Sequence, residues 1–253
     1  SLPSLTSDPP PIYAQSAVVI DAESGRVLLS LDPHQRRPIA STTKVMSSIV
    51  FLKAQPNLDE AVTVESAAVS QIGSLMGLLS GEQLTLRDLL SGAMLVSGND
   101  AIYQIAEHQG GFEQFVRTMN QTATEIGLKD TSFRDPAGLD DSGYSSAFDL
   151  GTMLRYALTF DVFRSLAILP ELTVSSSVQT FHLTNSNRLV RSDEPLYLPD
   201  TIGGKTGFTP DAGHSIVAAA ERDGHILIAA VLASDDTAPD GSAREARRLL
   251  TWT

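Results

Sequence analysis

The residues with the clearest chemical potential form the tetrapeptide Ser41-Thr42-Thr43-Lys44, which opens an apolar run from Val45 to Leu52. This pattern predicts a helix with the tetrapeptide at its N-terminus. A spacing of three places Ser41 and Lys44 on one helix face, so that the amine can take the hydroxyl proton and activate the serine as a nucleophile. Burial and the positive end of the helix dipole both favour the neutral amine that such a base requires. The motif is short, and chains of this composition also contain it by chance.

A second motif, Ser97-Gly98-Asn99, falls at the break between two predicted helices. A loop at this point can present the Ser97 hydroxyl beside Lys44 as a proton relay to a leaving amine, and the Asn99 amide can hold a substrate carbonyl. Serine and asparagine at a helix junction also serve as turn and cap residues, so this motif has a purely structural interpretation as well.

The third motif is Lys205-Thr206-Gly207, preceded by Gly203-Gly204 and leading into a predicted strand pair. Such a strand offers a cation for a substrate carboxylate, a hydroxyl to orient it, and glycines that let another backbone approach closely. The alternative is a plain edge strand, because lysine commonly blunts sheet edges.

Composition narrows the possible functions of the 253-residue chain. Its content of 42% hydrophobic and 19% charged residues is typical of a globular protein with a sizeable core. A formal charge of -12 without a run of lysine or arginine argues against nucleic acid as a partner. The absence of cysteine excludes disulfides, thiolate metal sites and a cysteine nucleophile. The five histidines are scattered without ligand spacing, so we expect neither a metal site nor a cofactor.

The sequence predicts β-strands near both ends of the chain. Residues Ser16 to Asp21 and Arg26 to Leu31 predict one hairpin, and Ser215 to Glu221 with His225 to Ala233 predict a second, each around a connection ending in glycine. Ser242 to Trp252 predicts an amphipathic helix.

Apolar positions within 86–94, 102–106 and 112–119 predict three helices between these ends. We therefore expect an α+β fold, with an antiparallel sheet built from both chain ends (residues 1–58 and 140–253), flanking helices, and an inserted helical lobe (residues 59–139).

Each motif occurs once, and their serines and lysine follow in the order Ser41, Ser97, Lys205. With this set the chain resembles the active-site serine penicillin-recognising enzymes, most closely the low-molecular-mass penicillin-binding proteins that are D-alanyl-D-alanine carboxypeptidases. The likeness runs from about residue 16 to the end and implies a β-lactamase/transpeptidase-like fold. Longer segments that share it are Pro38 to Met46, Gly77 to Leu90, Met94 to Ala101, Asp135 to Leu139 and Gly204 to Gly213.

The resemblance implies a role for each motif residue. Ser41 would attack the carbonyl of the penultimate D-alanine, Lys44 would accept its proton, and Ser97 would help to protonate the departing D-alanine. Backbone N–H groups of Ser41 and Phe208 would hold the oxyanion. Water would then hydrolyse the acyl-enzyme.

Substrate binding is implied for the remaining positions. Lys205 and Thr206 would receive the terminal carboxylate, with Gly207 and Phe208 continuing the strand, and Asn99 would hold the peptide side. Many members of the family bring a late arginine to the carboxylate, but the alignment on Glu245-Ala246 places Ser242 there. Arg244 lies two residues further on, about half a helical turn away, and is the candidate substitute.

The implied partners are peptidoglycan stem peptides ending in D-Ala-D-Ala, and β-lactam antibiotics as covalent inhibitors. We expect an exported, extracytoplasmic enzyme of cell-wall synthesis and cell shape, whose signal peptide and any membrane-attaching segment are absent from this sequence.

Three alternatives stay open. A β-lactamase would need a deacylating glutamate, for which the segment Glu125 to Leu128, followed by Lys129, is the nearest match. A D,D-endopeptidase would use the same groups on a cross-link. A peptidoglycan-binding relative would keep the fold and lose the chemistry.

Overall fold

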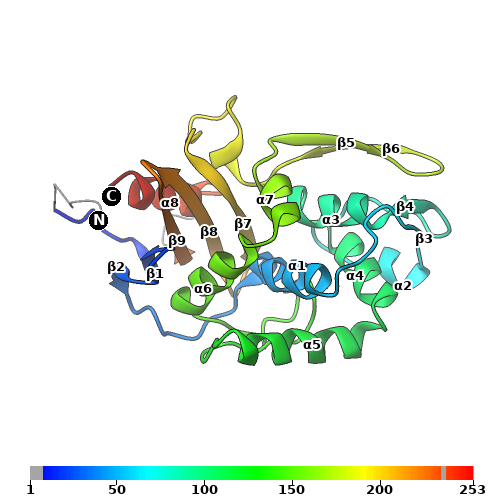
Figure 1. Ribbon diagram of the computed structural model, residues 1–253, viewed down its shortest axis with the longest axis horizontal. Coiled ribbons are helices and arrows are strands. Elements are labelled where there is room, and N and C mark those ends of the chain that lie inside the picture. Colours follow the sequence, from blue (N-terminus) through cyan, green and yellow to red (C-terminus); the bar gives the residue numbers. More distant parts are fainter. Residues whose placement is uncertain (1–7, 235–237, 253) are drawn as a thin grey trace.

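The fold centres on a five-stranded antiparallel sheet with the strand order β2-β1-β9-β8-β7 (Figure 1). This computed structural model describes residues 8–234 and 238–252, so residues 1–7 of the polar start lie outside it. Both predicted hairpins are confirmed, and β1 pairs with β9, which joins the two chain ends in one sheet. The strands are β1 (Ala14–Asp21), β2 (Val27–Leu31), β7 (Thr201–Thr209), β8 (Gly213–Arg222) and β9 (His225–Ser234).

The central strands are apolar along most of their length because helices cover both faces of the sheet. On β8, Ile216, Ala218 and Ala220 face one cluster, whereas Val217 and Ala219 face the other, as the two-residue period of a strand requires. The predicted C-terminal helix is confirmed as α8 (Gly241–Trp252), which packs on β8 and β9. The opposite face receives α6 (Ala147–Ala157).

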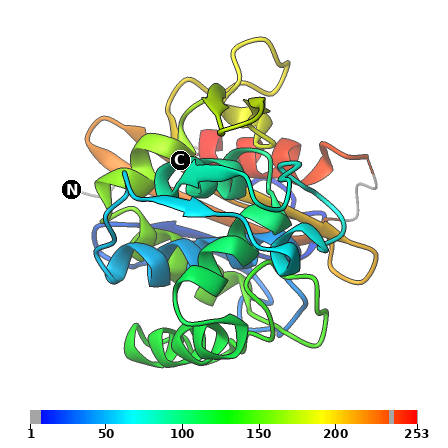
Figure 2. The same ribbon diagram turned by 90° about the vertical axis from the view of Figure 1, so that its right-hand side faces the viewer.

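The helical part of the molecule shares one hydrophobic core with α6 and the sheet face that α6 covers. The three helices predicted between residues 86 and 119 are confirmed as α3 (Leu86–Leu95), α4 (Asn99–His108) and α5 (Phe112–Glu125). They surround the buried helix α1 (Lys44–Lys53), and Figure 2 shows α5 on the outer side of this group. The division at residues 59 and 139 stays a prediction. The remaining elements are the turns η1 (Ala40–Thr43) and η2 (Arg188–Val190), helices α2 (Ser66–Val69) and α7 (Asp161–Ala167), and the strand pairs β3 (Ala61–Thr63) with β4 (Gln83–Thr85) and β5 (Glu171–Ser175) with β6 (Thr180–Thr184).

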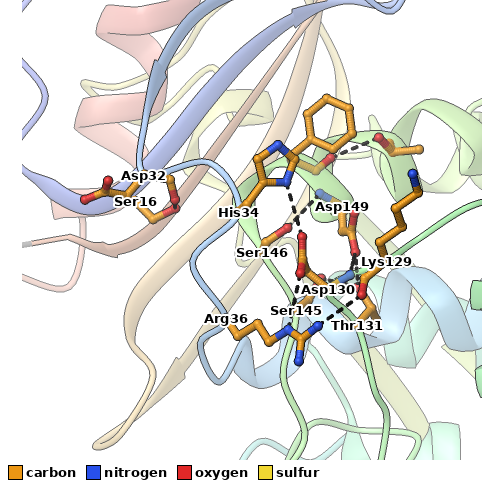
Figure 3. A network of polar contacts seen from close by, with 12 residues as sticks. Ser16, Asp32, His34, Arg36, Lys129, Asp130, Thr131, Ser145, Ser146 and Asp149 are labelled. Carbon is orange, nitrogen blue, oxygen red and sulfur yellow. Dashed lines mark hydrogen bonds and ion pairs between the residues drawn. The ribbon is translucent and has the colours of Figure 1, made fainter.

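The segment between β2 and η1, which leads to Ser41, is tied down by a polar network (Figure 3). His34 Nδ1 and Arg36 Nε each lie 3.2 Å from a carboxylate oxygen of Asp130. Asp149 Oδ2, at the start of α6, accepts hydrogen bonds from Asp130 N at 2.6 Å and Thr131 Oγ1 at 2.8 Å. Burial raises the pKa of Asp149 against these hydrogen bonds. The network therefore joins the approach to the first motif to α6.

No helix within residues 8–234 and 238–252 has the length and hydropathy needed to cross a membrane.

Candidate active site

Ser41 lies in η1, the single 3-10 turn that precedes α1. The predicted helix start is therefore tighter than an α-helix, and in a 3-10 turn side chains at i and i+3 eclipse one another. This geometry brings Lys44 Nζ to 3.0 Å from Ser41 Oγ. The preceding residue, Ala40, has the left-handed φ of +46°, which costs a non-glycine residue free energy and marks a backbone held by its surroundings.

Lys44 is fully buried and its amine is surrounded by oxygen atoms. Besides Ser41, Nζ contacts Asn99 Oδ1 at 2.7 Å and Ala137 O at 3.1 Å. Burial, and next the positive charge of Lys205, hold the pKa of Lys44 well below its ordinary value against the opposing carboxylates of Asp135 and Asp100. An amine of this kind can accept a proton from a neighbouring hydroxyl.

The second lysine of the site contacts the second serine. Lys205 Nζ lies 3.0 Å from Ser97 Oγ and 3.1 Å from Thr206 O. Burial lowers the pKa of Lys205 to about 7. Ser97 follows α3 and has a left-handed φ of +62°. The structure thus shows two lysine–serine pairs, and the hydrogen bond of Ser97 is with Lys205 where the sequence placed it beside Lys44.

Asn99 connects the first pair to the helical part. Its Oδ1 accepts from Lys44, and its Nδ2 donates to Ile72 O at 2.6 Å. The capping interpretation of this motif is wrong for α4, because its N-cap is Gly98 and no side chain caps it. Asn99 instead uses one amide N–H and its side-chain carbonyl to link Lys44 to the backbone at Ile72.

Strand β7 forms the opposite wall and is an edge strand of the sheet. The view of Lys205 as an edge-blunting lysine is wrong, because its side chain is buried. Gly207 lies against the backbone at Ser41, since a Cβ there would lie 2.9 Å from both Ile39 O and Ser41 N. Phe208 is 56% exposed, and its ring stacks on His214 with centroids 4.4 Å apart.

An open groove of about 550 Å³ lies between strand β7 on one side and the segments that carry Ser41 and Ser97 on the other. Of the predicted residues it is lined by Ser41, Ser97, Thr206, Gly207 and Phe208, whereas Lys44, Asn99 and Lys205 lie buried behind its surface. The other lining residues are Ser74, Val96, Ser186, Arg188, His214, Ser215, Pro239, Ser242 and Ala243.

Several groups that shape the site were missed in the sequence. Asp135 accepts hydrogen bonds from the backbone N–H groups of residues 137–140 and so fixes the loop that carries Ala137 O. An aspartate shortly before a glycine is a turn signal that predicts such a loop. Ser186 Oγ lies 2.9 Å from Thr206 Oγ1, and Arg188 lines the groove, but neither belongs to a recognisable motif.

The structure places both candidates for the position of the late carboxylate-binding arginine, Ser242 and Arg244, on α8. Ser242 lines the groove, as the alignment placed it. Arg244 is bonded to Asp240 at 2.8 Å and is not among the described residues that line the groove. Within the described part of the chain, no three His, Asp or Glu side chains are grouped so that they could hold a metal ion.

Comparison with known proteins gives the family. The family described as D-alanyl-D-alanine carboxypeptidase matches residues 4–236, and the chain belongs to it. The chain is 35% identical over 223 residues to the D-alanyl-D-alanine carboxypeptidase DacB2 of Mycobacterium tuberculosis, covering 87% of this chain and 74% of the relative. It is 33% identical to a D-alanyl-D-alanine endopeptidase of Escherichia coli, covering 84% and 68%. The chain spans 61% of the length of the Bacillus subtilis carboxypeptidase DacF, to which it is 32% identical over 93% of its own residues.

Solved structures give the same fold. A Streptomyces DD-transpeptidase matches with a TM-score of 0.90 at 30% identity, covering 97% of this chain and 98% of that one. A D-alanyl-D-alanine carboxypeptidase of Mycobacterium tuberculosis matches with a TM-score of 0.89 at 32% identity, covering 100% and 95%. The predicted family and the predicted transpeptidase-like fold are confirmed.

Proposed function

We propose that this protein is a serine-type D-Ala-D-Ala carboxypeptidase, which removes the terminal D-alanine from peptidoglycan stem peptides outside the cytoplasm. The observation that carries the proposal is the buried amine of Lys44, 3.0 Å from Ser41 Oγ at the foot of an open groove. The family and the names of its relatives supply the substrate class.

In the proposed acylation step, Ser41 Oγ attacks the carbonyl carbon of the penultimate D-alanine and its proton passes to Lys44 Nζ. Charge develops on the carbonyl oxygen, which the N–H groups of Ser41 and Phe208 would bind. The close approach of Gly207 to Ser41 N brings these two stretches of backbone together.

In the second half of this step the C–N bond breaks, and the nitrogen of the leaving D-alanine takes a proton. Ser97 is suited to deliver it, because its hydroxyl contacts the Lys205 amine, and burial brings the pKa of Lys205 to about 7. Water then adds to the ester carbonyl on Ser41, and its proton returns through Ser97 to Lys205. The bond from the carbonyl carbon to Ser41 Oγ breaks, Ser41 Oγ regains the proton held by Lys44, and the shortened peptide is released.

The same acyl-enzyme would form with β-lactams, whose ring carbonyl takes the place of the peptide. Rapid turnover of that adduct would need a deacylating base. Glu125, the nearest sequence match for one, forms an ion pair with Lys53 on a surface remote from the described lining of the groove. This position favours a carboxypeptidase over a β-lactamase.

The test combines labelling with product release. Wild type, Ser41→Ala and the matched control Ser165→Ala, whose serine lies exposed on α7, are incubated with a fluorescent penicillin. Wild type and the control should label and release D-alanine from an acylated peptide ending in D-Ala-D-Ala, and Ser41→Ala should do neither. An unlabelled wild type, or labelling that survives in Ser41→Ala, would contradict the proposal.

A cross-linked peptide dimer in the same assay separates the two activities named among the relatives. Release of D-alanine without cleavage of the dimer supports a carboxypeptidase. Faster cleavage of the dimer would assign the groove to endopeptidase chemistry instead.

A further inference from the structure

The groove must bind the terminal carboxylate of the proposed substrate, and none of the residues predicted for this role presents a cation at the groove surface. Ser242 contributes a neutral hydroxyl, and Arg244 is engaged with Asp240. The Lys205 side chain is only 1% exposed, and its amine contacts Ser97 and Thr206 O. A carboxylate entering the groove therefore needs another cationic side chain at the surface.

Arg188 occupies that place. It begins the turn η2, which packs against both β7 and α8, the two elements that flank this part of the groove. Among the described residues that line the groove, Arg188 is the only lysine or arginine. Two residues earlier, Ser186 contacts the Thr206 hydroxyl, so the backbone that carries Arg188 is joined to the third motif.

The backbone under Arg188 is fixed by buried amide side chains. Asn187 N donates to Asn185 Oδ1 at 2.9 Å, and Leu189 N donates to Asn187 Oδ1 at 3.1 Å. Asn185 Nδ2 in turn donates to Leu169 O at 2.8 Å, and Ser186 N donates to Leu95 O at 2.9 Å. This arrangement presents the arginine from a rigid turn, which lowers the entropic cost of binding a ligand.

The charge of Arg188 is only loosely compensated. Its contact with Glu194 is 3.6 Å long, and Glu194 lies closer to Arg191, at 3.2 Å. The other neighbouring acid, Asp240, is bonded to Arg244 at 2.8 Å. The Arg188 side chain is 39% exposed, and a guanidinium carries five N–H donors in a planar fork that matches a carboxylate.

We propose that Arg188 is a specificity residue that binds the free carboxylate of the terminal D-alanine together with the Thr206 hydroxyl, so that the groove's cation comes from η2 and not from α8. This inference rests on the proposed function for the identity of the ligand. It predicts that the enzyme distinguishes a peptide acid from the corresponding peptide amide through Arg188.

The test measures binding without chemistry. Affinities of an acetylated tripeptide ending in D-Ala-D-Ala, and of its C-terminal amide, are determined by titration calorimetry on Ser41→Ala and on Ser41→Ala/Arg188→Gln. The preference for the acid should fall by about 10- to 100-fold in the second protein, as expected for a charge-assisted pair, while the amide affinity stays within about twofold. Arg188→Lys should restore part of the preference, since it keeps the charge and loses the fork.

Arg117→Gln and Arg164→Gln are matched controls, because each removes an exposed guanidinium that does not line the groove and forms no ion pair with Glu194 or Asp240. Both should keep the acid preference, and thermal unfolding should confirm that all variants fold. An unchanged preference in Arg188→Gln, an equal loss in Arg164→Gln, or no preference in the parent protein would overturn the inference. Penicillin labelling of the wild type is scored separately, so a failure of the proposed function is recognised independently.

Discussion

Replacement of Gly138 by alanine should displace the backbone at Ser41 without touching the Ser41 side chain. A Cβ at Gly138 would lie 1.9 Å from Ala40 O, 2.4 Å from Ala40 C and 2.7 Å from Thr43 Oγ1. Real Cβ contacts stay beyond 3.0 Å, so one of the two backbones must move by about 1 Å. Ala40 directly precedes Ser41 and is already in a left-handed conformation, so the shift would pass to Ser41.

The expected loss of stability has two parts, the backbone strain of alanine at a positive φ and the steric overlap of its Cβ. Gly138 has φ +80°, and alanine in this region costs about 1–2 kcal/mol. Gly127 has φ +82° and nothing within 4 Å of its Cβ position, so Gly127→Ala carries the strain alone. We expect Gly127→Ala to lower Tm by about 2–8 °C and Gly138→Ala to lower it further, since overpacking adds about 1–3 kcal/mol. A displacement of about 1 Å at a reacting group can cost about 100-fold in rate.

The assay is the rate of acylation by a fluorescent penicillin, with circular dichroism to confirm folding. Gly127→Ala should acylate at the wild-type rate, and Gly138→Ala should be slower by about 100-fold at a temperature where both proteins are folded. Wild-type acylation by a folded Gly138→Ala would refute the claim that this glycine positions Ser41 through Ala40.

Two further predictions concern buried charges. Asp135→Asn removes a carboxylate that accepts four backbone hydrogen bonds, so the free energy of unfolding should fall by about 1.5–3 kcal/mol and acylation should slow. The control is Asp59→Asn, which changes an exposed carboxylate. An unchanged Tm in Asp135→Asn would contradict the prediction. Lys205 has a folded pKa of about 7 and an ordinary value of 10.5, so between these values the unfolded chain binds a proton that the folded protein lacks. The free energy of unfolding of wild type relative to Lys205→Met should therefore rise with pH from about 7 to 10.5 in urea titrations, and a constant or falling difference would show the lysine to be ordinary.

The sequence predicted the elements that local chemistry specifies. The turn Arg222-Asp223-Gly224 predicts the β8–β9 hairpin, because Asp223 and Gly224 adopt φ of +51° and +77°, which these residue types tolerate best. The helix α8 follows from apolar residues at helical spacing over the sheet. By contrast, β3 and β4 have three residues each, too few for a periodic signal, and were not predicted.

Residue type and order along the sequence picked out the motif residues that the structure brings together, but not which of them pair. Spacing along the chain does not determine whether Ser97 contacts Lys44 or Lys205, because the answer depends on how α4 and β7 meet. Arg188 was missed for the same reason, since it becomes a groove residue only when η2 packs between β7 and α8. The left-handed φ of Ala40 is likewise imposed by tertiary packing, because alanine itself gives no reason for it.

The arrangement of the two lysines connects the electrostatics with the proposed chemistry. Both amines are buried, and the charge of Lys205 helps to lower the pKa of Lys44. Two charged amines in one buried site repel each other, so holding a proton on Lys205 favours the neutral form of Lys44. Peptide cleavage needs both conditions, since a proton must leave the attacking hydroxyl and another must reach the departing amine. The contacts of Lys44 with Ser41 and of Lys205 with Ser97 place an acceptor and a donor at these two positions, which is why the second pair matters as much to the proposal as the first.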